Sequence, residues 1–289
     1  MIVAVDTVLQ GVLLGGLYAL FAAGLSLIFG VMRLVNLAHG DMIVLAAFLI
    51  FSFAQTLGLG LAPAVLIAVP LMFVIGYALQ YLLLNRVVGK DILPPLLITF
   101  GLSIFTQNGL LAAYSADSRR LAAGGLEGAS IPLAPGLAIG VMPLMTLAAA
   151  VGVIVALNQL FYRTAMGRAF RAVSDDPSTA QLMGIDNRRV FATAMGLALA
   201  VSALAAFFLG VRANFDPSIG PARLIFAFEA VIIGGLGSLW GTLAGGVILG
   251  LAQTIGAEIN PEWQLLAGHL VFLAVLVLRP RGLFARGAA

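Results

Sequence analysis

The chain has 289 residues, of which 62% are hydrophobic and only 9% are charged, and its mean hydropathy is +1.11. A water-soluble domain needs about 25% charged residues to cover its surface, so this composition excludes a soluble globular protein and indicates a multi-pass membrane protein. The 15 Lys and Arg residues are scattered between apolar runs, which excludes a continuous basic face for nucleic acid, and the absence of Cys excludes disulfides and thiolate metal sites.

Apolar runs of about 17 to 25 residues predict transmembrane helices. In chain order they cover residues 8–32, 37–57, 62–84, 94–114, 137–161, 190–211, 224–236, 239–257 and 263–278. The run at 224–236 is too short for a full crossing and ends at "GGLGS", which favours a half-helix or one arm of a re-entrant hairpin. The sequence therefore predicts an all-α polytopic membrane protein in one domain, residues 1–289. It has about nine transmembrane or partly spanning helices, or eight if residues 224–257 form such a hairpin.

The distribution of Lys and Arg predicts the orientation, because positively charged loops stay on the cytoplasmic side. The start of the chain has Asp6 and no basic residue, so no cleavable leader is expected. With nine crossings and the N-terminus outside, eleven of the 15 basic residues fall inside: Arg33, Arg86, Lys90, Arg163, Arg168, Arg171, Arg188, Arg189, Arg279, Arg281 and Arg286. Four fall outside: Arg119, Arg120, Arg212 and Arg223. We therefore expect the N-terminus outside and the C-terminus inside.

The stretch "MRLVNLAHGD" places polar residues between the first two apolar runs. Asn36 and His39 are three apart and would share a helix face, while Gly40 and Asp41 suit a break that leaves backbone groups free. Polar side chains occur within the bilayer only where protein or water forms hydrogen bonds with them. We expect Asn36, His39, Gly40 and Asp41 to line and gate the cytoplasmic half of a translocation path, with Arg33 at the headgroups. The alternative is a turn that only caps two helices.

Residues 163–189 form the longest polar segment on the predicted cytoplasmic side. Asp176 is a good N-cap, Pro177 fits the first helical position, and Gly184 fits the left-handed residue that ends a helix. The short helix between them offers three apolar contacts, from Ala180, Leu182 and Met183. A helix of this length is not stable alone, so it either docks onto a partner or rests on lipid headgroups.

The catalytic motifs that would indicate an enzyme are missing from the sequence. No Walker motif, zinc-protease motif or nucleophile elbow is present, so no cofactor or metal is expected, and ATP hydrolysis would need another chain. Glu229 is the only convincing acid within an apolar run, and His39 and His269 are the only histidines. Glu229 could relay protons along the path or bond to a neighbouring helix or subunit. Small residues that let helices approach recur at Gly237, Gly241 and Gly245.

Four stretches together resemble the permease subunits of ATP-binding cassette importers for branched-chain and other hydrophobic amino acids. They are "GLSLIFGVMRLVNLAHGDM", "RAFRAVSDDPSTAQLMGI", "FEAVIIGGLGSLWGTLAGGVILG" and "LVLRPRGLF". The resemblance implies a non-enzymatic transport subunit in the bacterial inner membrane. It also implies a second permease subunit of different sequence, two cytoplasmic ATPase subunits and a periplasmic amino-acid-binding protein as partners.

In the same resemblance, residues 163–189 correspond to the coupling loop, and residues 176–185 would be the helix that inserts into the ATPase. Ala180 and Gly184 match an Ala-x-x-x-Gly core and would lie on one face toward that partner. The residues alone leave one other class open, an ion-coupled secondary transporter of a small solute. That class would require paired acidic and basic residues near the bilayer midplane.

Overall fold

The computed structural model describes residues 2–89, 91 and 93–284. Its helices are α1 (Ile2–Met32), α2 (His39–Phe51), α3 (Leu61–Leu82), α4 (Leu93–Tyr114), α5 (Val141–Arg163), α6 (Ala165–Asp175), α7 (Pro177–Leu182), α8 (Asn187–Arg212), α9 (Gly220–Gly234), α10 (Leu239–Ile259) and α11 (Trp263–Leu278). A π-helical turn, η1 (Ser52–Thr56), extends α2, and a 3-10 turn, η2 (Leu84–Arg86), follows α3. The two strands are β1 (Ser130–Ala134) and β2 (Leu137–Gly140).

Seven helices in the described part of the chain are long and apolar enough to cross a membrane, which confirms an all-α polytopic membrane protein. They are α1, α2 with η1, α3 with η2, α4, α5, α8 and α10. The segment predicted to be short is α9, whose 15 residues span about 22 Å, less than the roughly 30 Å of a bilayer core. It forms an antiparallel hairpin with α10. The number of crossings and the orientation stay predictions.

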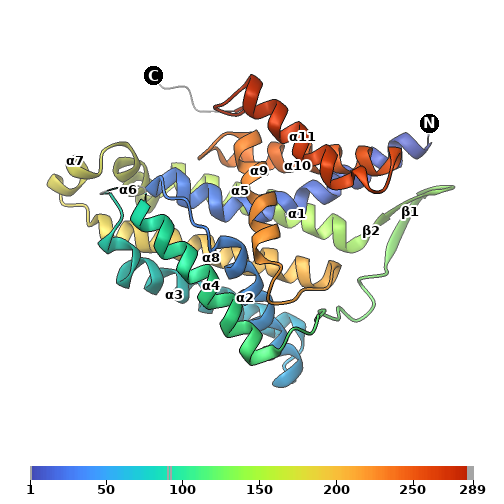
Figure 1. Ribbon diagram of the computed structural model, residues 1–289, viewed down its shortest axis with the longest axis horizontal. Coiled ribbons are helices and arrows are strands. Elements are labelled where there is room, and N and C mark those ends of the chain that lie inside the picture. The colour runs from blue at the N-terminus through green and yellow to red at the C-terminus, as the bar shows by residue number, and fades with distance from the viewer. Residues whose placement is uncertain (1, 90, 92, 285–289) are drawn as a thin grey trace.

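α1 runs through the middle of the molecule and is buried along most of its length (Figure 1). Its sequence is apolar on every side, as expected for a helix surrounded by other helices. Glycines allow those neighbours to approach closely: a Cβ at Gly15 would collide with the backbone of α10, one at Gly16 with Leu147 of α5, and one at Gly24 with the Ala198 carbonyl of α8.

The predicted small-residue contacts of α10 are present. Cβ atoms at Gly241 and Gly245 would collide with the carbonyl groups of Gly234 and Ala230 on α9. Gly237 plays a different part, because it lies in the turn before α10, with φ of +78°, against Gly30 of α1. The α9–α10 hairpin is therefore held by backbone-to-backbone packing.

The two ends of the helix bundle differ: α6 and α7 lie at one end, and β1 and β2 lie at the opposite end (Figure 1). At the first end Asn85 Nδ2 donates to the Arg188 carbonyl at 3.0 Å. At the second, Arg119 and Phe215 form an antiparallel bridge. Loops predicted on the same side of the membrane thus contact each other. Lys90 and Arg286, which contribute to the predicted orientation, lie outside the described residues.

The β-hairpin was not predicted, and it corrects the start of one expected helix. The sequence predicts that this helix starts at residue 137, but residues 137–140 form β2 and pair with β1. Gly136, with φ of +82°, makes the turn between the strands, and α5 begins only at Val141. Hydropathy alone does not separate an apolar strand from the first turn of an apolar helix.

Candidate functional site

The segment between α1 and α2 folds back into the interior of the helix bundle. α1 ends at Met32, and the next residue, Arg33, donates its N–H to the Phe29 carbonyl at 2.9 Å and has a φ of +52°. α2 then begins at His39, whose Nε2 lies 2.9 Å from the carbonyl oxygen of Phe21. Phe21 precedes Met32 by eleven residues, or about 16 Å along the helix axis. The N-terminus of α2 therefore lies beside the middle of α1.

The polar residues of this segment are buried against the rest of the chain. Asn36 Oδ1 accepts from the Ala38 N–H at 3.0 Å, which closes a turn before α2, and Asn36 Nδ2 lies 3.9 Å from the sulfur of Met195. The His39 ring is fully buried, and its Nδ1 has no hydrogen-bond partner among the described residues. Asn36 thus stabilises the turn before α2, and whether these residues gate a path or only form this turn stays a prediction.

Asp41 lies where the N-termini of two helices meet. It is in the first turn of α2, and its Oδ1 lies against Gly220, the first residue of α9, where a Cβ would collide with it. A Cβ at Gly40 would collide with the carbonyl of the same Gly220. Helix N-termini carry partial positive charge, so both helices stabilise the carboxylate. Its Oδ2 accepts from Ser103 of α4 at 2.5 Å, while its Oδ1 has no partner in the described structure.

Polar groups continue from Asp41 along α4 toward its outer surface. Gln107 Nε2 donates to Ser103 Oγ at 3.0 Å, and Asn108 is exposed with its Nδ2 bonded to the Ile104 carbonyl at 2.8 Å. Asn108 lies within an apolar helix that is otherwise suited to lipid. An amide in that position is costly against hydrocarbon, so the outer face of α4 needs a protein or water neighbour.

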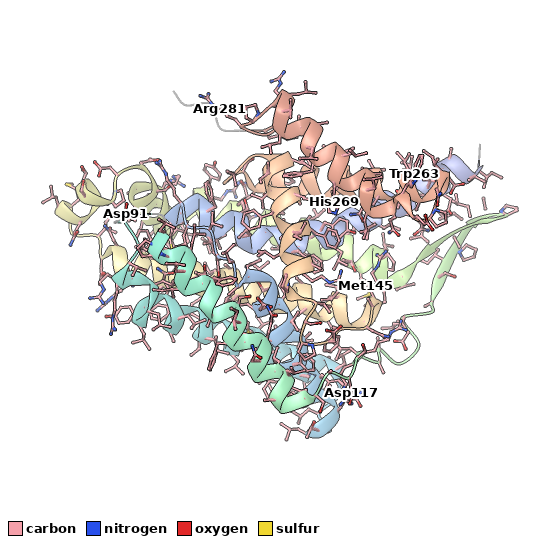
Figure 2. All side chains as sticks on the ribbon, in the orientation of Figure 1. Asp91, Asp117, Met145, Trp263, His269 and Arg281 are labelled. Atoms are coloured by element: carbon pink, nitrogen blue, oxygen red, sulfur yellow. The ribbon has the colours of Figure 1, made fainter. Side chains whose placement is uncertain are left out.

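Glu229 has a partner, His269, that its place in the sequence does not indicate. Its side chain on α9 is only 3% exposed, and its Oε1 is hydrogen-bonded to Nδ1 of His269 on α11, whose side chain is 42% exposed. Figure 2 shows His269 on the inner side of α11. Close by, the Tyr18 hydroxyl donates to Gln253 Oε1 at 2.5 Å, and the Tyr18 ring packs on Phe226 of α9. These contacts join α1, α9, α10 and α11.

The predicted coupling helix is α7, and its caps are as expected. Asp176 accepts hydrogen bonds from the N–H groups of Ser178 at 2.9 Å and Thr179 at 3.1 Å, and from both of their hydroxyls at 2.6 Å. These bonds hold the pKa of the Asp176 carboxyl well below its usual range. Pro177 is the first helical residue, and Gly184, with φ of +86°, follows the helix end.

The face that α7 presents to its surroundings differs from the one expected. Ala180 is only 4% exposed and packs inward, whereas Leu182 and Met183 are 87% and 79% exposed. The expectation that Ala180 and Gly184 form one outward face is therefore wrong, because α7 ends at Leu182 and Gly184 leaves the helix. The tip of α7 therefore exposes two large apolar side chains, those of Leu182 and Met183.

The described residues contain no group of three or more His, Asp or Glu side chains that could hold a metal ion. In each of the two polar centres, around Asp41 and around Glu229, one carboxylate oxygen is hydrogen-bonded to a side chain of another helix. The structure therefore brings together Gly40, Asp41, Ser103 and Gly220 in one place, and Glu229 with His269 in another.

Comparison with known proteins gives a consistent family. The family model described as the branched-chain amino acid transport system permease component matches residues 7–278. The high-affinity branched-chain amino acid transport system permease protein BraD of Pseudomonas aeruginosa is 28% identical over 291 residues, which cover 96% of this chain and 94% of that protein. The corresponding permease protein LivH of Escherichia coli is 28% identical over 292 residues, with the same coverage.

A shorter match involves a second permease protein of Escherichia coli, LivM, which is 27% identical over 129 residues, or 44% of this chain and 30% of that protein. No solved structure is significantly similar to the chain. The family match covers nearly all of the helices described above, including α2, α7 and α9. The chain therefore belongs to the family of permease components of branched-chain amino acid transport systems.

Proposed function

We propose that the chain is a permease subunit of an ATP-binding cassette importer that carries branched-chain or other hydrophobic amino acids across the bacterial inner membrane. Two cytoplasmic ATPase subunits drive the importer, and a periplasmic binding protein delivers the amino acid. The observation that carries this proposal is the exposed apolar tip of α7, in a chain whose family is that of amino-acid permeases.

α7 suits a coupling role for physical reasons. It is six residues long, firmly capped by Asp176, and located at the extreme end of the molecule (Figure 1). Ser174 Oγ, just before it, donates to the Gly30 carbonyl of α1 at 2.7 Å. Movement of a partner bound to Leu182 and Met183 is thus transmitted through the short, capped helix α7 to the central helix α1. Rigid-body motion of packed helices is a usual basis of switching.

The outer face of α4 supports a second permease subunit as neighbour. It carries exposed Phe105 and Asn108, and a lipid environment satisfies only the first of these. The Escherichia coli relatives include two permease proteins of different sequence, LivH and LivM. We infer that a paralogous chain of the LivM type covers α4, and that the polar row from Asp41 through Gln107 to Asn108 faces the path between the two subunits.

One observation favours the alternative class, an ion-coupled secondary transporter. Glu229 and His269 form a paired acid and base within the apolar helices, the arrangement that such transporters use for protons. In the importer, the same pair has a structural task, which is to join α9 to α11. The two functions differ in their energy source.

Reconstitution in sealed proteoliposomes separates the two functions. The chain is assembled with its candidate second permease and ATPases, and uptake of labelled leucine is measured with ATP enclosed and the binding protein outside. The proposal expects uptake that requires both ATP and the binding protein and that persists with a protonophore. Uptake by this chain alone, driven by a pH gradient and abolished by the protonophore, would establish the alternative.

A further inference from the structure

A cavity of about 580 Å³ opens at the end of the molecule that carries α6 and α7. It lies between the end of α1, the start of α4 and the start of α7. Its walls include Phe29, Arg33, Val35, Asp91, Leu96 and Pro177. Figure 2 shows Asp91 at this end of the molecule, close to the start of α4. Its volume is in the usual range of small-molecule sites, roughly 300–1,000 Å³.

The cavity combines apolar walls with one basic and one acidic side chain. Arg33 and Asp91 are both exposed, whereas Phe29, Val35 and Leu96 are half-buried. The hydrogen bond that the described residues give the Arg33 guanidinium is a long one, 3.5 Å from Nη2 to the Ser174 carbonyl, so most of its N–H groups remain available. Asp91 has no hydrogen bond or ion pair with the described residues.

The backbone holds Arg33 in an unusual conformation. Its φ of +52° is in the left-handed region, which residues other than glycine, asparagine and aspartate seldom occupy. The residue ends α1 through the bond from its N–H to Phe29. The side chain of Arg33 lines the cavity from this position, where a glycine would be accommodated at no steric cost.

We propose that this cavity binds a free apolar α-amino acid on the cytoplasmic side, a proposal that rests on the proposed function for the cargo class. The guanidinium of Arg33 takes the carboxylate, the carboxylate of Asp91 takes the α-ammonium, and Phe29, Val35 and Leu96 surround the apolar side chain. Pro177, the first residue of α7, also lines the cavity. A bound amino acid therefore contacts the coupling helix directly.

The test measures binding to the purified full chain in nanodiscs made only of phosphatidylglycerol, by ligand-observed NMR. The probes are leucine, 4-methylpentanoate, which lacks the ammonium, and 3-methylbutylamine, which lacks the carboxylate. Arg33→Gln should weaken leucine and 4-methylpentanoate about tenfold and leave the amine unchanged, because a charge-assisted bond is lost. Asp91→Asn should weaken leucine and the amine and leave 4-methylpentanoate unchanged. Arg168→Gln and Asp117→Asn, which lie outside the cavity, should bind as the wild type does.

Leucine binding that is absent, or equal in the wild type and both cavity variants, overturns the site. Zwitterionic phosphatidylethanolamine shares the two charges, so the measurement is repeated with that lipid added. Binding of its headgroup to the cavity in place of leucine also overturns the proposal. ATP-driven leucine uptake by the assembled importer, without binding that depends on Arg33 and Asp91, refutes this site and leaves the proposed function standing. Absence of ATP-driven uptake, with the analogue pattern intact, refutes the function and leaves the site standing.

Discussion

The Nε2 atom of His39, at the start of α2, lies 2.9 Å from the carbonyl oxygen of Phe21, in the middle of α1. The bond fixes the depth at which the polar segment after α1 returns to a helical conformation. Gly24 makes the approach possible, because a Cβ there would collide with the His39 ring. The first polar segment of the sequence is thus part of the interior of the protein.

His39→Ala should reduce leucine uptake by the assembled importer, because α2 loses its attachment to α1 and a cavity opens beside Phe21. His39→Gln keeps a donor of similar reach and should retain most of the uptake. Both are measured at equal membrane abundance, with thermal unfolding recorded in parallel. Unchanged uptake in His39→Ala would leave this segment with a capping role only.

Gly220→Ala should destabilise the protein by about 1–3 kcal/mol, because the added methyl group must displace Asp41 or separate α2 from α9. The matched control is Gly109→Ala on α4, where the added methyl group meets open space and should be neutral or slightly stabilising. The measurement is thermal unfolding of both variants in detergent. Equal unfolding temperatures would contradict the close contact between the two helix N-termini.

Glu229→Gln should retain ATP-driven uptake, because an amide can still form a hydrogen bond with the His269 ring. His269→Leu leaves the Glu229 carboxylate buried without its partner and should cost roughly 1–3 kcal/mol of stability. The double variant Glu229→Leu with His269→Leu should lose less unfolding free energy than the two single variants lose in total, as expected for a coupled pair. Loss of uptake in Glu229→Gln at wild-type stability would instead indicate proton transfer through this pair.

Single cysteines can test the orientation, since the chain has none of its own. We expect cysteines at Lys90 and Arg171 to react only with reagents that reach the cytoplasm, and cysteines at Arg119 and Asp216 to react from outside. The measurement is labelling of intact cells with an impermeant maleimide, before and after permeabilisation. External labelling at residue 171 would reverse the assignment of both ends of the molecule.

Helix positions were predicted well because the bilayer imposes them. An apolar run long enough to cross must be helical, so α3, α4 and α10 begin within one residue of the predicted spans. The caps of α7 were equally accessible, since Asp176, Pro177 and Gly184 act through local geometry. The strand Leu137–Gly140 was missed because hydropathy does not distinguish it from a helix start.

Contacts between distant segments could not be predicted from one sequence. Glu229 and His269 are separated by 40 positions, and nothing in their spacing indicates that α9 and α11 bring them together. The meeting of Asp41 with Gly220 depends in the same way on helix packing. The inward orientation of Ala180 follows from how α7 rests on its neighbours, which an element of six residues does not determine by itself.

In the proposed importer, the tip of α7 docks onto an ATPase subunit. The most direct test is substrate-stimulated ATP hydrolysis by the reconstituted importer carrying either Leu182→Glu or Met183→Glu. These side chains are exposed, so the variants should fold and assemble into membranes normally, but a charge buried unpaired at the interface should abolish the stimulated hydrolysis together with leucine uptake. Met166→Glu adds the same charge to an exposed position of α6 and should retain both activities. Full stimulated hydrolysis in the α7 variants would show that α7 rests on lipid and does not couple the chain to an ATPase.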